Sequence, residues 1–380
     1  MTERSFRIGF VVGESSGDAL ATGIAAELRA RVPSVSFHGV GGEGLQAQGL
    51  RTIFDPNEIA IVGVTAVLAK LPRLVRLIGF TAKALADARP DVVVLIDAPD
   101  FTHRVAAKLR ERLPNLPIVK VVAPTVWAWR PERAAALRPI VDEVLAIFPH
   151  EPDVMAKLGG PPTTFIGHPL AGLDWTRPIG AEERPHLVVL PGSRTSEIER
   201  LVGPFGETAA ILAERIGPMR VTVPALPRSA RLVRDRVADW GTEATVVEDD
   251  AAKRAAFLSA DAALAASGTV SLELALADVP SVVAYRLDAL ERAVARRKIT
   301  SWAMAMPNII ADRVVVYEAL NDMVIPQRMA RILERLLADT PERAAQLCGF
   351  ATVRERLATT RPPSELAAER ILSHVKLGSA

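Results

Sequence analysis

The alternation of short apolar runs with longer amphipathic stretches constrains the fold of this chain more than any other feature. Continuous runs of Val, Ile and Leu are typical of strands buried on both faces of a parallel sheet. The stretches between them are long enough for the helices of βαβ units. About five runs lie before residue 170 and five after residue 185, at 8–12, 35–40, 92–96, 118–122 and 144–148, then 187–190, 220–223, 245–247, 262–265 and 281–284.

The length of 380 residues suits two domains. We predict an α/β protein with two Rossmann-like, doubly wound domains at 1–170 and 186–350, facing across a cleft. Residues 171–185 are rich in proline and charge without periodicity, which indicates a linker. Residues 351–380 are helical in pattern and are broken at 361–363. Their last helix packs either on its own domain or back on the first.

Composition excludes several classes of protein. A net charge of +2 argues against a dedicated nucleic-acid binder. Cys348 is the only cysteine, so no internal disulfide can form. The start lacks a signal-peptide pattern, and the apolar run at 59–69 is too short to span a membrane. We therefore expect a cytoplasmic protein without a transmembrane helix.

The first candidate site follows the first apolar run. Gly13, Glu14, Ser16 and Gly17 lie in a strand-to-helix turn, where backbone N–H groups and the helix dipole favour an anion. The alternative is a tight turn in which Ser or Asp18 caps the helix. The turn is not a complete dinucleotide fingerprint.

Two aspartates follow the run at 92–96. Asp97 is placed to act as a general base, because a carboxylate just past a strand faces the ligand crevice. Asp100 could instead cap a helix that begins near Thr102. A metal site is disfavoured, because no further ligand follows at a suitable spacing.

A third site lies at 191–194, again between a strand and a helix. Gly192 lets a backbone approach closely, Ser193 can donate its hydroxyl, and Arg194 offers donors that match phosphate oxygens. Together they predict a diphosphate site that stabilises a departing anion. The alternative is a capped helix start with a solvent-facing arginine.

A fourth site at 267–273 strengthens the third. Ser267, Gly268 and Thr269 form another anion-binding helix start, and Glu273 one turn later could accept two hydrogen bonds from a ribose diol. A capping-box role for Glu273 would need a spacing one residue shorter. Two such turns in one domain predict a nucleotide site.

Other features have two interpretations each. Trp127 and Trp129 either line a sugar or acyl site or belong to the core. The apolar segment 59–80 carries Lys70, Arg73 and Arg76, so it is either part of the core or an interfacial segment that binds anionic lipid. Polar substitution of Leu74, Leu77 and Ile78 tests the second interpretation by liposome binding. The basic cluster at 286–298 is either a solvated face or a contact for phosphorylated lipid.

In this order, the motifs resemble the lipid-A-disaccharide synthase family. The resemblance covers about 7–330 and rests on the segments 13–18, 96–101, 124–130, 165–169, 190–194, 266–269 with Glu273, and 307–308. It implies the GT-B fold and an inverting, metal-independent glycosyltransferase that needs no cofactor. The implied donor is UDP-2,3-diacylglucosamine, the acceptor is 2,3-diacylglucosamine 1-phosphate (lipid X), and the products are the β-1,6-linked disaccharide 1-phosphate and UDP. The implied location is peripheral, on the cytoplasmic face of the inner membrane, and a homodimer is left open.

The resemblance also implies roles by position. Asp97 matches the general base, and Glu14 and Ser16 match polar residues of the acceptor side. The residues that match the donor or UDP site are Gly192, Ser193, Arg194, Ser267, Gly268, Thr269, Glu273, Asn308 and Gln327. The sequence departs from the family pattern at His150, Asp312 and Tyr317, which puts local loop shape in doubt.

Two other functions remain open on the sequence. One is a UDP-N-acetylglucosamine 2-epimerase, which shares the two-domain fold but leaves the segment 59–80 unexplained. The other is a non-catalytic membrane-docking module, which would not need both Asp97 and a full nucleotide set. An assay for disaccharide and UDP separates all three functions.

Overall fold

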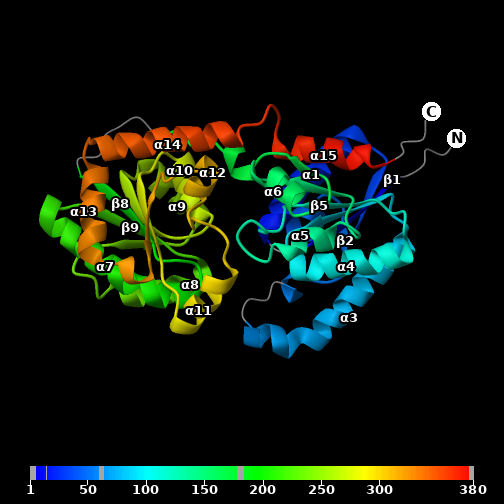
Figure 1. Cartoon of the computed structure of the whole chain (residues 1–380), viewed down its shortest axis with the longest axis horizontal. Helices are drawn as coiled ribbons and strands as arrows, with labels where there is room; N and C mark the ends of the chain where they lie inside the picture. Colours follow the sequence, from blue (N-terminus) through cyan, green and yellow to red (C-terminus); the bar gives the residue numbers. More distant parts are fainter. Residues whose placement is uncertain (1–5, 14, 60–63, 178–183, 376–380) are drawn as a thin grey trace. The chain divides into compact units, whose positions relative to one another are not determined.

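The computed structural model describes residues 6–13, 15–59, 64–177 and 184–375. It divides into two units (Figure 1). Unit 1 comprises Met1–Gly172 together with Thr359–Ala380, and unit 2 comprises Leu173–Ala358. Each unit contains one parallel sheet, as the apolar runs predict.

Unit 1 contains a seven-stranded sheet in the order β3-β2-β1-β4-β5-β6-β7. All of its strand pairs are parallel. The strand order reverses between β1 and β4, which pair from Ile8↔Val92 to Val12↔Ile96. Ligands of doubly wound sheets bind at such a switch point. The strands are β1 (Phe6–Val12), β2 (Val35–Val40), β3 (Arg51–Thr52), β4 (Val92–Ile96), β5 (Ile118–Val121), β6 (Glu143–Ala146) and β7 (Thr163–Phe165).

Helices cover both faces of this sheet (Figure 1). Alternate residues of β4 point to opposite faces, with Val92, Val94 and Ile96 in one core and Val93 and Leu95 in the other. The first core is closed by α1 (Ser15–Arg31) and α15 (Pro363–Ser373), and the second by α3 (Val64–Ala88) and α4 (Pro99–Arg112). The shorter elements are α2 (Glu43–Ala47), η1 (Pro56–Glu58), α5 (Glu132–Leu137), α6 (Glu151–Lys157) and η2 (Pro169–Gly172).

Unit 2 contains a six-stranded parallel sheet in the order β10-β9-β8-β11-β12-β13, whose switch point lies between β8 and β11. Its strands are β8 (His186–Leu190), β9 (Arg220–Pro224), β10 (Thr245–Val247), β11 (Ala262–Ala266), β12 (Ser281–Tyr285) and β13 (Tyr317–Leu320). Its helical elements are α7 (Thr195–Ile216), α8 (Pro227–Val237), α9 (Asp250–Ser259), α10 (Val270–Leu276), α11 (Ala289–Lys298), α12 (Met306–Ala311), η3 (Asn321–Met323), α13 (Pro326–Leu337) and α14 (Pro341–Leu357).

The last two helices belong to different units. α14 lies in unit 2, whereas α15 packs on α1 in unit 1, where it buries Ala367, Ala368 and Ile371. The carboxylate of Glu143 on β6 is 1% exposed, and it binds Arg370 at 2.9 Å and the His374 ring at 2.6 Å. The predicted segment 351–380 therefore splits after Ala358, and its last helix returns to the first unit.

The structure adds three strands to those expected from apolar runs: β3, β7 and β13. β3 has two residues, β7 reads Thr-Thr-Phe, and β13 contains Glu318. None of these forms a continuous apolar run, which is why the prediction of five strands in each half was wrong.

Residues 173–177 of the predicted linker are attached to unit 2, whereas 171 and 172 belong to unit 1. Arg254 stacks on the ring of Trp175, and Arg177 donates a hydrogen bond to the carbonyl of Asp278. Residues 178–183 lie outside the described structure.

Candidate active site

Asp97 lies at the switch point of unit 1, directly after β4. Asp97 and Ala98 both have left-handed backbone, with φ of 53° and 37°. This conformation costs free energy in non-glycine residues and persists only where the surroundings hold it. Thr102 Oγ1 donates to the carbonyls of Asp97 and Ala98, at 2.9 and 3.1 Å, and Lys120 Nζ donates to the carbonyl of Asp97 at 2.8 Å. The loop is therefore fixed by contacts with α4 and with the buried Lys120 of β5.

The first turn of α1 packs against this loop because glycines leave room for it. A Cβ atom on Gly17 would lie 2.8 Å from Asp97 Oδ2, and one on Gly13 would lie 2.1 Å from the Cβ of Ala98. The amino end of α1 and the Asp97 carboxylate are thus neighbours, as the pairing of β1 with β4 requires. The sequence motifs at 13–18 and 96–101 form one site in the structure.

Burial raises the pKa of the Asp97 carboxyl above its ordinary value, and the nearby Lys120 ammonium offsets this only in part. A carboxylate with a raised pKa is a better proton acceptor near neutral pH. The geometry therefore suits Asp97 to a general-base role.

The acceptor-side residues from the first motif are only partly described. Glu14 and the side chain of Ser16 lie outside the described structure. Asp18 accepts hydrogen bonds from the backbone of Gly42 at 2.7 Å and of Gly44 at 2.9 Å. It therefore fixes the β2–α2 loop.

Asp100 is not the N-cap of α4. α4 begins at Pro99, and its N-cap residue, Ala98, has no side-chain cap. The Asp100 carboxylate instead pairs with Arg133 at 2.6 Å. The capping prediction placed the helix start three residues too late.

Aromatic and imidazole rings gather after β5, β6 and β7. The rings of Trp127 and His150 meet edge to face at 5.2 Å, and Phe148 lies against both His150 and His168. Glu151 is buried beside them, accepts the backbone N–H of Phe148 at 3.1 Å, and has its pKa raised by burial to about 8. Trp127 is therefore part of a packed layer, and the departure at His150 lies in the same layer.

Trp129 makes a cation–π contact with the next residue. The guanidinium of Arg130 stacks over its ring, 5.3 Å from the centroid. Both residues are half-buried.

In unit 2, the backbone of the motif at 191–194 wraps around the carboxylate of Glu197. Gly192 has a φ of +123°, and a Cβ there would lie 2.7 Å from the Cβ of Glu197. Glu197 accepts the backbone N–H groups of Ser193 and Arg194, at 3.2 and 3.3 Å, and its other oxygen lies 2.8 Å from the Arg194 guanidinium. Arg194 is nevertheless 60% exposed, so the guanidinium is available to a ligand.

The motif at 267–273 lies beside it, because β8 and β11 are paired at Leu190↔Ala265. Thr269 is the N-cap of α10 without a side-chain cap. Glu273 makes no capping box, because both of its oxygens bind Lys253 of α9, at 3.0 and 2.8 Å. Sequence reasoning missed Lys253, which is 20 residues from Glu273 and shares no local motif with it.

Asn308 and Gln327 contrast with each other. Asn308 is 2% exposed, and it uses its amide oxygen and nitrogen in hydrogen bonds to β13 and to the segment before it. Gln327 is exposed in the first turn of α13, on the side of the sheet where β13 ends.

Within the described residues, no three His, Cys, Asp or Glu side chains form a metal-binding group.

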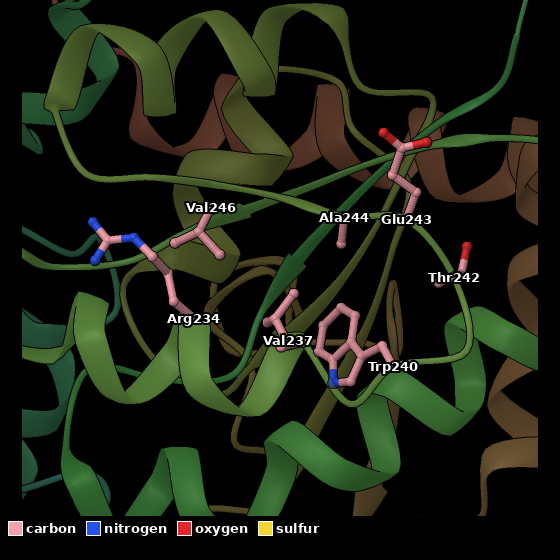
Figure 2. Close-up of a pocket in the computed structure, with 8 residues that line it drawn as sticks. Arg234, Val237, Trp240, Thr242, Glu243, Ala244 and Val246 are labelled. Carbon is pink, nitrogen blue, oxygen red and sulfur yellow. The ribbon is translucent and has the colours of Figure 1, made fainter.

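A groove elsewhere in unit 2 is lined by α8, β10 and the loop between them (Figure 2). Trp240 lies in it and packs on Gly206 of α7, where a Cβ would come within 2.3 Å of the indole. The groove lies at the amino end of β10, whereas the motifs follow the carboxyl ends of β8 and β11. It is therefore separate from the candidate nucleotide site.

Solved structures with the same architecture define the class of protein. The chain superposes on MurG from Acinetobacter baumannii with a TM-score of 0.61 and 14% identity, covering 97% of this chain and 99% of that one. It superposes on MnaA of S. aureus, solved with UDP, with a TM-score of 0.60 and 13% identity, covering 97% and 95%. The fold is GT-B, with two Rossmann-like units, and the predicted fold class is confirmed.

The sequence then specifies the family. The family model described as lipid-A-disaccharide synthetase matches residues 8–369. The lipid-A-disaccharide synthase of Rhodopseudomonas palustris (strain HaA2) is 43% identical, over 97% of this chain and 96% of that protein. The chain belongs to the lipid-A-disaccharide synthetase family, as its motifs predict, and is a glycosyltransferase of lipid A biosynthesis.

Proposed function

We propose that the protein transfers 2,3-diacylglucosamine from UDP-2,3-diacylglucosamine to lipid X, forming the β-1,6-linked disaccharide 1-phosphate and UDP. The observation that carries this proposal is the half-buried Asp97 at the end of β4, with its raised pKa, in a chain that matches its family from residue 8 to 369. Transfer with inversion needs a single displacement and one base, by analogy with glycosidases.

Asp97 acts as that base and removes the proton of the acceptor's 6-hydroxyl group. The oxygen then attacks the anomeric carbon of the donor, and the bond to UDP breaks. The position of Asp97 beside Gly17 supports this role, because the loop holds the carboxylate where few waters can solvate it.

Unit 2 binds the donor. The turn at Gly192, Ser193 and Arg194 receives the diphosphate, and Arg194 stabilises the charge on departing UDP. The turn at Ser267, Gly268 and Thr269 supports the nucleotide from the neighbouring strand, and Glu273 accepts the ribose hydroxyls. Gln327 lies at the same edge of the sheet.

The competing function is 2-epimerisation of UDP-N-acetylglucosamine, because the UDP-GlcNAc 2-epimerase from Neisseria meningitidis, solved with UDP-GlcNAc, shares the fold at a TM-score of 0.57 and 13% identity. One assay separates the two reactions. Purified protein given both acylated substrates releases UDP and disaccharide in equal amounts if the proposal holds. Epimerised UDP-sugar without UDP release would favour the epimerase over the proposed transferase. Folded protein that forms neither product would favour a docking module.

We also propose that unit 1 binds anionic lipid peripherally through α3. Leu71 and Val75 are one helical turn apart and are 42% and 51% exposed, and Phe80 is 54% exposed. Arg76 lies on the same helix, whereas Arg73 is paired with Glu58 at 2.7 Å. Among the described residues, no helix is long and apolar enough to cross a membrane.

The structure changes which α3 residues should be tested. Ile78 is buried, and Leu74 and Leu77 pack on the core, so their polar substitution would damage the fold. Residues 60–63 and the side chain of Lys70 lie outside the described structure. Leu71→Ser with Val75→Ser should abolish flotation with anionic liposomes and leave UDP binding intact, and unchanged flotation would contradict the α3 assignment.

The basic cluster at 286–298 is a weaker candidate for lipid contact, because two of its arginines already have partners within the protein. Arg292 binds both oxygens of Asp322, at 3.0 and 3.1 Å, and Arg286 donates to a backbone carbonyl. The side chains of Arg296 and Arg297 lie outside the described structure. We further propose that the protein lies on the cytoplasmic face of the inner membrane, which cell fractionation tests. We also propose that it forms a homodimer, which light scattering tests.

A further inference from the structure

The short segment before α12 is hydrogen-bonded to the Ser267 turn. Ser267 Oγ donates to the carbonyl of Met304 at 2.8 Å. The backbone N–H of Met306 donates to Ser271 Oγ at 3.1 Å, and that hydroxyl donates to the carbonyl of Gly268 at 2.8 Å. The segment and the turn therefore form one hydrogen-bonded structure, and a shift of either moves the other.

Glu318 of β13 holds this segment from the opposite side. Its carboxylate accepts the backbone N–H of Met304, 3.1 and 3.0 Å from the two oxygens, and that of Ala305 at 2.9 Å. It also accepts Asn308 Nδ2 at 2.8 Å. Hydrogen bonds to an ionised carboxylate are stronger than neutral ones, so this side chain is the main attachment of the segment to the sheet.

Asn308 has no remaining hydrogen-bonding capacity for a ligand. Its amide oxygen accepts the N–H groups of Val315 and Val316, at 2.7 and 2.8 Å. Its amide nitrogen donates to the carbonyl of Val316 at 3.0 Å and to Glu318. An asparagine amide offers two donors and two acceptor lone pairs, and all four are engaged here in a side chain that is 2% exposed.

We propose that Glu318 is a positioning residue of the nucleotide site and that Asn308 acts on the nucleotide only through it. The route runs from the Asn308 amide to the Glu318 carboxylate, on to the N–H groups of Met304 and Ala305, and from the carbonyl of Met304 to Ser267. This inference rests on the proposed function, because it concerns binding of the UDP end of the donor.

An exchange of amide and carboxylate tests the route. Glu318→Gln presents an NH₂ group to donors, and Asn308→Asp places a second carboxylate against Glu318, so each should weaken UDP binding about tenfold or more. In the double variant, the amide introduced on β13 can donate to the carboxylate introduced on α12, which restores one hydrogen bond and the net charge. The introduced carboxylate still faces the carbonyl of Val316, to which Asn308 donates, so recovery should be partial. We expect the double variant to bind UDP at least about threefold more tightly than Asn308→Asp, measured by calorimetry.

A second readout does not depend on the ligand. Hydrogen exchange at the amides of Met304 and Ala305 should be slow in the wild type and fast in both single variants. In the double variant the Met304 amide should be slow again, because the remaining oxygen on β13 can accept it. The Ala305 amide should stay fast, because it shares Glu318 Oε1 with Asn308 and the introduced NH₂ group takes that place. Ser271→Ala, a milder change that removes the acceptor of Met306 N–H, should weaken UDP binding in the same direction but less. Glu334→Gln, which loses only a surface pair with Arg215, is the matched control and should leave UDP binding unchanged.

Each contrary result has a definite meaning. If the double variant binds UDP as weakly as Asn308→Asp, Asn308 does not act through Glu318 and the inference is wrong. If Glu318→Gln frees the two amides without changing UDP affinity, Glu318 has a purely structural role and the inference is also wrong. Wild-type protein that binds no UDP would overturn the proposed function itself.

Discussion

The two switch points of this molecule use carboxylates in opposite ways. In unit 1, Lys120 and Thr102 hold the loop through the backbone carbonyl of Asp97. Within the described residues, the Asp97 carboxylate itself makes no hydrogen bond. In unit 2, the carboxylates of Glu197 and Glu318 are used to hold the backbone of their loops. A group that must accept a proton has to stay uncommitted, whereas a turn that must receive an anion benefits from being held in shape beforehand.

The largest expected effect concerns the uncommitted carboxylate. Asp97→Asn should lower kcat by about 10²–10⁴, the usual contribution of general-base catalysis, with UDP affinity unchanged. Turnover would be measured by disaccharide formation and binding by calorimetry. Near-wild-type turnover in this variant would remove Asp97 from the base role.

The pH profile gives an independent measure of the same group. Because burial raises the Asp97 pKa, kcat/KM should fall on the acid side with a midpoint above the ordinary aspartate value of 3.8. The acid limb should move when Lys120, whose charge lowers that pKa, is replaced by Met. A limb that stays in place would mean that another group titrates.

The next effect concerns the anion turn. Arg194→Ala should lower kcat by about 10²–10³, as loss of one charge-stabilising donor does in other enzymes. Arg194→Lys should recover only part of the loss, because an ammonium group cannot make two parallel hydrogen bonds to phosphate. Equal activity of the Lys variant and the wild type would mean that charge alone suffices.

A smaller effect should come from the contact between α1 and the Asp97 loop. Gly17→Ala adds a Cβ 2.8 Å from Asp97 Oδ2, so the carboxylate must move and kcat should fall about tenfold or more. Gly79→Ala is the matched control, since it lies in α3 with nothing within 4 Å of the new Cβ. The control should keep full activity and gain stability of about 0.5–1 kcal/mol. Similar activities of the two variants would show that Asp97 tolerates displacement.

The smallest effect lies outside both sites. Glu143→Gln weakens the pairs with Arg370 and His374 and should lower the free energy of unfolding by about 1–3 kcal/mol. The pKa of Glu143 is lowered in the folded state, because hydrogen bonds from His374, Thr164 and Arg370 together outweigh the effect of burial. Its contribution is thus present above the ordinary glutamate pKa of 4.5 and is lost as pH falls through the lowered value. Denaturant unfolding at pH 7 and pH 3 checks this, and an equal difference between variant and wild type at both pH values would contradict it.

Local patterns in the sequence were sufficient to predict the strand–turn–helix backbone of both sites. A strand, a glycine-rich turn and a helix follow one another at 8–20 and at 187–198, so the positions of Gly13, Gly17 and Gly192 could be predicted. The adjacency of the motif pairs then follows from strand order, which a single sequence does not specify.

The side chains that hold the sites could not be predicted in this way. Lys120 reaches Asp97 across 23 positions, and Lys253 reaches Glu273 across 20. A lysine in a strand or on a helix carries no local signal for such a partner. The exposed face of α3 could not be predicted either. Leu74, Leu77 and Ile78, chosen from the sequence for the membrane test, pack on the core, whereas Leu71 and Val75 are exposed. Leu71 and Ile78 are two helical turns apart, so the 3.6-residue period alone does not separate them.

The return of α15 to unit 1 also affects the order of folding during synthesis. Unit 2 is one continuous stretch, Leu173–Ala358, so all of its strands and helices exist before the last segment is made. Unit 1 lacks the helix that buries Ala367, Ala368 and Ile371 until that segment leaves the ribosome. A nascent chain of this protein should therefore complete its second unit while the core beneath α1 is still open to solvent, and would need protection there until α15 is made.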